Sequence, residues 1–250
     1  TQLAAFACNG LLLAMTRGQM RGVMAPLVNY IGLSSREWAL SQKPWGRPRK
    51  TYCWLMLQPE MCRRRCMDTR MLDTLSKPAL GTLTEPENTA SSGTGLTVAL
   101  AVGLFRKLIR LPQGELDMLG AEAVALTHGG ASAFLTGAAI AHIVSLLVKD
   151  TSLPFRNAAL DAARAVKEQY GHRYSQAFEV AGQITLAASM AQDRATPPAA
   201  VMERLQCENA AQILGGAVYA VLSSGENLDT ALITAVNHSG RSGAVASLVG

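Results

Sequence analysis

The sequence is poor in aromatic and in charged residues. Aromatic side chains make up 5% of the 250 residues and charged side chains 16%, against 49% hydrophobic residues. A β-sandwich draws on aromatic and β-branched side chains, whereas 22 glycines and recurrent alanine-rich stretches suit closely packed helices. We therefore predict an all-α fold, a compact multi-helix single domain that spans residues 1–250. The chain lacks an initiator Met, so a fragment truncated at both ends and a complete processed form are both open.

The cysteines follow no regular framework, which excludes a disulfide scaffold. There are five, an odd number, at Cys8, Cys53, Cys62, Cys66 and Cys207. Because an odd number of cysteines without regular spacing favours a reducing compartment, we predict a cytoplasmic protein. Cys62 and Cys66 have the i,i+4 spacing of half a zinc site, but no second Cys/His pair lies nearby, so we favour unpaired structural thiols. The first residues also lack the charged start and cleavage site of a signal peptide.

The net charge of +5 comes largely from one segment, between Lys43 and Arg70. Its arginines alternate with Trp45, Tyr52 and Trp54, a mixture that a single-stranded nucleic-acid surface would use. Short arginine runs are more often solvated loops, and residues 43–50 read KPWGRPRK with no periodicity. We therefore expect an exposed loop there and no nucleic-acid partner.

Apolar residues recur at helical spacing along most of the chain. Gly18 and Gly22 interrupt the first helix, residues 80–95 are expected to be a long irregular loop, and a Gly/Ser-rich turn, NHSGRSG, precedes the final apolar run. The predicted helices are 2–15, one ending at 38–42, a weak one near 52, 68–75, 96–105, one from 113 toward 130, 131–148, 157–170, 174–192, 198–222 with an interruption near Cys207, and 227–236.

Residues 131–148 form an apolar stretch of nearly membrane-spanning length. A preceding His-Gly-Gly, many small residues and the lack of a second such stretch favour a buried central helix, so no membrane partner is expected. His142 lies inside this stretch and is predicted to be a core histidine with satisfied hydrogen bonds. His172 follows a predicted helix end and is expected to be exposed.

Several short segments suggest a family because of their order and spacing. The chain opens with a threonine, an apolar helix and an Arg-Gly pair, and residues 38–42 end a helix with Trp and Gln. Further along come GTLTEPEN at 81–88, VGL at 102–104, LTHG at 126–129 and DTALITAVNHSG at 229–240. Together they resemble the ADP-ribosylglycohydrolase family over essentially the whole chain, although Thr97-Val98 stands where the family has Met-Arg.

The resemblance implies hydrolysis of the N- or O-glycosidic bond of ADP-ribosylated substrates with a pair of Mg²⁺ or Mn²⁺ ions. Thr1 would be the threonine ligand of the first metal motif, whose acidic residues would precede it. In the second motif, normally Asp-Ser-Asp-Ser-Thr-Gly, Arg241 and Gly243 replace the aspartates and Ala244 replaces a serine. Because hard cations prefer oxygen ligands, we expect incomplete metal binding, with the positive charge of Arg241 where an ion should sit.

The resemblance also implies where ADP-ribose or an ADP-ribosylated protein binds. Backbone N–H groups of the loop 92–95 could receive a diphosphate without a metal, although an ordinary flexible loop fits the sequence equally well. His128 would face the ligand or cap a helix. We expect an impaired hydrolase or, alternatively, an inactive ADP-ribose-binding or structural protein on the same fold. The implied substrate-binding residues are Asn88, Ser92, Gly93, Thr94, Gly95, Thr127, His128, Gly129, His238 and Ser239.

Overall fold

The chain folds into a bundle of α-helices, as expected from its composition. The computed structural model describes residues 2–43, 50–65, 68–225 and 227–250, and within these ranges it contains twelve α-helices and no strand. Three short 3-10 helices, Trp54–Leu57, Pro59–Cys62 and Phe105–Lys107, join them. The α-helices are α1 Gln2–Arg21, α2 Leu27–Ser41, α3 Thr69–Ser76, α4 Thr97–Leu104, α5 Gln113–Ala125, α6 Ala131–Lys149, α7 Phe155–Tyr170, α8 Gln176–Met190, α9 Pro198–Leu205, α10 Ala210–Ser223, α11 Leu228–Val236 and α12 Ser242–Val249.

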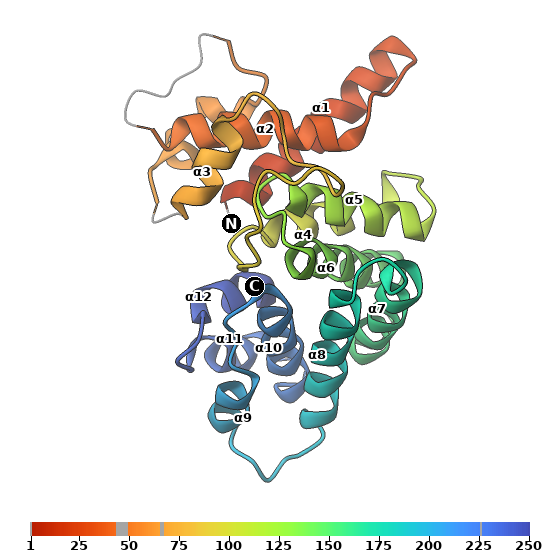
Figure 1. Cartoon of the computed structure of the whole chain (residues 1–250), viewed down its shortest axis with the longest axis vertical. Helices are drawn as coiled ribbons and strands as arrows, with labels where there is room; N and C mark the ends of the chain where they lie inside the picture. Colours follow the sequence, from red (N-terminus) through yellow and green to blue (C-terminus); the bar gives the residue numbers. More distant parts are fainter. Residues whose placement is uncertain (1, 44–49, 66–67, 226) are drawn as a thin grey trace.

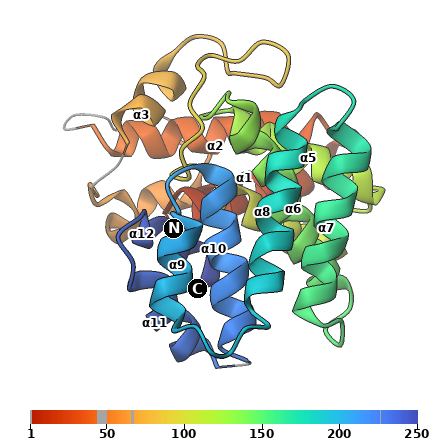
Figure 2. The same cartoon turned by 60° about the horizontal axis from the view of Figure 1, so that its bottom comes forward.

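Helix α6 is the centre of the bundle. It packs against α4, α5, α7, α8 and α10, and Figures 1 and 2 show it enclosed between these helices. Among the described residues, α6 alone is long and apolar enough to cross a membrane, and 72% of that apolar window is buried inside the protein. The prediction of a buried central helix over residues 131–148 is therefore confirmed.

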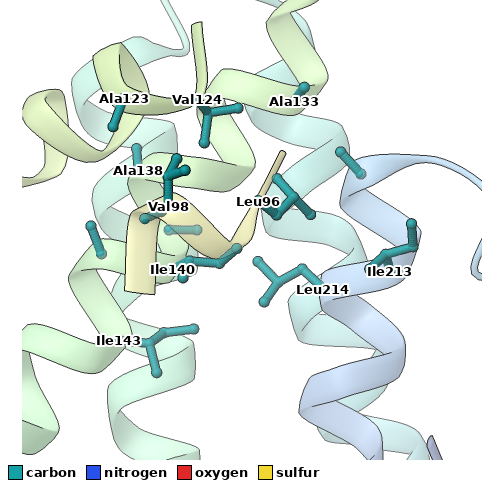
Figure 3. Close-up of a cluster of buried hydrophobic side chains, with 14 of the residues drawn as sticks. Leu96, Val98, Ala123, Val124, Ala133, Ala138, Ile140, Ile143, Ile213 and Leu214 are labelled. Carbon is teal, nitrogen blue, oxygen red and sulfur yellow. The ribbon is translucent and has the colours of Figure 1, made fainter. Parts of the chain in front are cut away.

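Small residues allow α5 and α6 to cross at close range. A Cβ atom added to Gly137 would lie 2.5 Å from Val124 Cγ2 and 2.8 Å from the carbonyl oxygen of Gly120. A Cβ atom on Gly120 would meet that of Ala141 at 2.5 Å. Where the helices separate, larger side chains fill the space, and Figure 3 shows Leu96, Ile140 and Leu214 in the core between α4, α6 and α10.

The first helix is longer than the sequence suggested. Gly18 does not interrupt α1, which continues to Arg21 and stops at Gly22, whose φ of 69° favours glycine. The weak helix expected near Tyr52 is instead a pair of 3-10 turns. The predicted closing turn is also shorter, because α12 begins within it at Ser242.

The interruption expected near Cys207 is confirmed. Helix α9 ends at Leu205, and both Gln206 and Cys207 adopt positive φ angles, 62° and 52°. Helix α10 then starts with a capping box in which Asn209 accepts a hydrogen bond from the Gln212 backbone and the Gln212 side chain accepts one in return.

Candidate functional site

A cleft of about 710 Å³ lies where the first helix meets the last one. Segments far apart in the sequence contribute its walls: the start of α1, the end of α2, residues from 60–65 and from 68–71, the loop before α4, and α12. The start of α1 and the end of α12 lie close together in both overall views (Figures 1 and 2). The cleft is lined by Gln2, Leu3, Trp38, Glu60, Met61, Arg65, Asp68, Met71, Gly93, Thr94, Thr97, Gly243, Ala244 and Ser247.

Four helices begin at this cleft. Gln2 starts α1, Asp68 is the N-cap of α3, Thr97 starts α4, and Gly243 lies in the first turn of α12. Each helix start carries the positive end of a helix dipole. The N–H of Arg70 at the start of α3 is already capped by Asp68 Oδ1, and at α12 the N–H groups of Ala244 and Val245 donate to the Arg241 carbonyl oxygen. The cleft is therefore electrostatically suited to an anionic group.

A buried histidine supports one wall of the cleft. His128 is only 1% exposed, and its Nε2 atom lies 2.9 Å from both Ser92 Oγ and Thr94 Oγ1. Its Nδ1 atom lies 2.9 Å from Thr127 Oγ1. Burial lowers the pKa of His128 to about 4, so the imidazole is neutral at neutral pH. Three predicted site residues, Ser92, Thr94 and Thr127, thus contact His128. Among them, Thr94 lines the cleft.

The loop 92–95 is packed against the body of the protein. A Cβ atom on Gly95 would lie 2.4 Å from His128 Nδ1, and one on Gly93 would lie 2.3 Å from Ile213 Cδ1. Just before the loop, the carbonyl oxygen of Ser91 accepts a hydrogen bond of 2.9 Å from the backbone of Ala210. At Gly95 the close approach to the buried His128 ring leaves no room for a side chain, whereas at Gly93 the end of the flexible Ile213 side chain could shift. The packing at Gly95 and the Ser91 hydrogen bond make the loop part of the cleft wall.

Asn88 holds this wall together and does not line the cleft. Its Nδ2 group donates to Thr74 Oγ1 at 2.9 Å and to the Thr127 carbonyl oxygen at 3.0 Å. Its Oδ1 atom accepts hydrogen bonds from the backbone of Ala90 at 2.9 Å and of Gly129 at 3.1 Å. Because the amide is used fully inside the protein, Asn88 supports the cleft wall and fixes the backbone of Gly129. Contact of Asn88 and Gly129 with a ligand stays a prediction.

Asp68 is a cleft residue that the sequence did not reveal. Its carboxylate accepts hydrogen bonds from Arg70 Nε and Nη2, both at 3.2 Å, and from Thr94 Oγ1 at 3.4 Å. Burial opposes ionisation, but the hydrogen bonds and the charge of Arg70 outweigh it and lower the pKa of Asp68. The only signal in the sequence was an Asp at the start of a predicted helix, which is common at N-caps.

The second motif reaches the cleft without its carboxylates. Gly243, at an aspartate position of the motif, and Ala244, at the following serine position, both line the cleft. Arg241 points elsewhere: its guanidinium is 64% exposed and its Nε atom lies 3.3 Å from Glu208 Oε2. Arg241 is not among the residues that line the cleft, and its charge at an ion position stays a prediction.

His238 and Ser239 lie in the turn before α12 and are not among the cleft residues. His238 Nε2 lies 3.1 Å from the carbonyl oxygen of Ala235, and its Nδ1 atom accepts a hydrogen bond of 3.1 Å from Gly240. The Ser239 backbone donates to Glu203 Oε1 at 2.8 Å. The predicted contact of His238 and Ser239 with substrate is thus not supported by their positions.

The described residues do not fit a pair of divalent ions. Thr1, the expected ligand, lies outside the described residues, as does Cys66 of the suggested half zinc site. Of the two acidic cleft residues, Glu60 pairs with Arg63 at 2.8 Å and Asp68 with Arg70 at 3.2 Å. Within the described ranges there is no group of three His, Cys, Asp or Glu side chains able to hold a metal.

The first and last helices of this all-α bundle thus line one cleft that combines apolar and polar side chains. The family model described as ADP-ribosylglycohydrolase matches residues 1–250, the whole chain, and the chain belongs to this family. No curated protein and no solved structure matches it.

Proposed function

We propose that the cleft binds the ADP-ribosyl group, free or attached to protein, and that hydrolysis is weak or absent in this chain. The observation that carries the proposal is that Thr94, beside His128, and Gly243, in the second motif, meet at one cleft. Family membership supplies the ligand class, and the side chains at the second motif argue against efficient cleavage.

The walls of the cleft suit the parts of ADP-ribose. Leu3, Met61 and Met71 provide apolar surface for a flat base, as small-molecule sites commonly do. The helix starts at Gly243 and Thr97 offer a positive potential to the diphosphate. Binding therefore needs no residue beyond those already in the cleft.

Cleavage would require groups that the second motif lacks. Metal-assisted hydrolysis uses a cation to position and activate water, and such cations need several oxygen ligands. Gly243 and Ala244 offer no side-chain oxygen, while Glu60 and Asp68 are engaged by arginines. We therefore assign no catalytic step to a metal here.

The test is a thermal unfolding series with ADP-ribose, with Mn²⁺ and with both, run beside a hydrolysis assay on an ADP-ribosylated protein. A ligand that binds only the folded state raises the Tm by mass action. We expect ADP-ribose to raise the Tm and the assay to show little product. Turnover that depends on Mn²⁺ would contradict the weak-hydrolysis part, and no shift with ADP-ribose would contradict binding.

A further inference from the structure

Arg65 is a cationic cleft residue whose backbone is anchored. The Arg65 N–H donates a hydrogen bond of 3.2 Å to Gln42 Oε1. Gln42 is 2% exposed and its amide Nε2 donates to Ser41 Oγ at 2.9 Å, so the end of α2 fixes the acceptor. The segment that carries the guanidinium is therefore held at the cleft and is not a free loop.

Arg65 also differs from its neighbours in its partners. Glu60 is neutralised by Arg63 and Asp68 by Arg70, both within ion-pair distance. Arg65 lines the same cleft. Among the residues that the structure describes, its side chain forms no ion pair with a carboxylate and no hydrogen bond. The cleft thus contains a positive charge that its own carboxylates leave uncompensated.

We propose that Arg65 binds the diphosphate of a nucleoside diphosphate in this cleft and replaces the charge that a divalent cation would supply. This inference rests on the proposed function. It adds that Arg65 is the residue that binds the diphosphate and that this binding needs no metal ion. A guanidinium presents several N–H donors in a plane and matches phosphate oxygens with two parallel hydrogen bonds. Thr97 and Gly243 contribute the other walls, so the diphosphate lies between Arg65 and the starts of α4 and α12.

The experiment is isothermal titration of the full chain with ADP-ribose in buffer containing EDTA, comparing wild type, Arg65→Gln and Arg64→Gln. Arg64 is the matched control, because it is the adjacent arginine, is exposed and does not line the cleft. We expect Arg65→Gln to raise the Kd by about tenfold or more, since hydrogen bonds to charged groups contribute about 1.5–3 kcal/mol, and Arg64→Gln to leave it unchanged.

Adenosine, which lacks phosphates, serves as the second probe. Its binding should be the same in wild type and Arg65→Gln if Arg65 acts on the diphosphate. Equal ADP-ribose affinity in wild type and Arg65→Gln, or binding only with Mn²⁺ present, would overturn the inference while leaving the proposed function intact. Failure of folded wild type to bind ADP-ribose with or without Mn²⁺ would overturn the proposed function and this inference with it.

Discussion

The Nδ1 atom of His142, in the middle of α6, lies 2.7 Å from Oδ2 of Asp117 in α5. On the other side of the ring, Nε2 lies 3.1 Å from Oδ2 of Asp161 in α7, and Arg164 pairs with that same carboxylate. The histidine is therefore a core residue with both nitrogens bonded, as its apolar surroundings in the sequence predicted, and it connects three helices.

Removing this histidine should destabilise the protein in a pH-dependent way. Burial opposes protonation, but the hydrogen bonds and charges of Asp117 and Asp161 outweigh it and raise the pKa of His142. The stabilising contribution of the imidazolium is complete below the unfolded pKa of about 6.5 and is lost as the pH rises through the raised folded pKa. We expect His142→Gln to cost about 3 kcal/mol in the free energy of unfolding at a pH near 6.

Urea unfolding across the pH range measures this difference between wild type and variant. His172→Gln is the control, because His172 is exposed beyond the end of α7, as predicted, and should change the unfolding free energy by less than about 0.5 kcal/mol. The role of His142 would be contradicted by a destabilisation that does not diminish at alkaline pH.

A glycine-to-alanine substitution should lower stability at the close crossing of α5 and α6 and raise it at an exposed glycine in α8. Gly137→Ala should destabilise by about 1–3 kcal/mol, because the new methyl group meets the Gly120 carbonyl oxygen and Val124. Gly182→Ala in α8 should stabilise by up to about 1 kcal/mol, since its Cβ meets nothing within 4 Å and alanine favours the helix. Thermal unfolding of the two variants measures both, and equal shifts would mean that the crossing is looser than described.

Blocking the cleft should abolish ligand binding without unfolding the protein. Thr94 is exposed and lines the cleft, so Thr94→Trp should fill part of its volume and prevent ADP-ribose from raising the Tm. Thr84→Trp is the control, because Thr84 is exposed in the same long loop but lies outside the cleft. Undiminished binding by Thr94→Trp, measured by titration calorimetry, would place the ligand elsewhere.

Restoring one carboxylate should create affinity for a cation. A Cβ atom on Gly243 meets nothing within 4 Å, so Gly243→Asp should fold normally and place a carboxylate in the cleft. We expect Mn²⁺ to raise the Tm of Gly243→Asp more than that of wild type. Gly243→Asn has nearly the same shape without the charge, and an equal Mn²⁺ response in Gly243→Asn would show that the cation binds outside the cleft.

Local features of the fold were predictable from the sequence, whereas the partners of side chains were not. The interruption at Cys207 and the buried helix around His142 follow from periodicity and composition, which act over a few residues. Gly18 looked like a helix end because glycine weakens helices, yet a single glycine costs only about 1 kcal/mol, and α1 continues through exposed residues to Arg21. The helix ends instead at Gly22, whose positive φ favours glycine.

The same distinction holds at the cleft. The sequence motifs predicted that Thr94, His128 and Gly243 belong to one site, although they are far apart along the chain. Asp68 and Arg65 were not recognised as cleft residues, because their position depends on how the stretch after α2 folds back, which no short pattern records. The ion pair of Arg241 with Glu208 was not predicted for a related reason, because the two residues are remote in sequence.

The turn at Gln206 and Cys207 positions the start of α12, which forms one wall of the cleft. The Cys207 carbonyl oxygen accepts a hydrogen bond of 3.0 Å from the Arg241 backbone, and a Cβ atom on Gly240 would lie 2.1 Å from the Gln206 carbonyl oxygen. The start of α12 is thus located by main-chain contacts to a distant turn and not by the side chains at Gly243 and Ala244. Substitutions at those two positions can therefore remove or supply ligand groups while the opening that receives the ligand keeps its form.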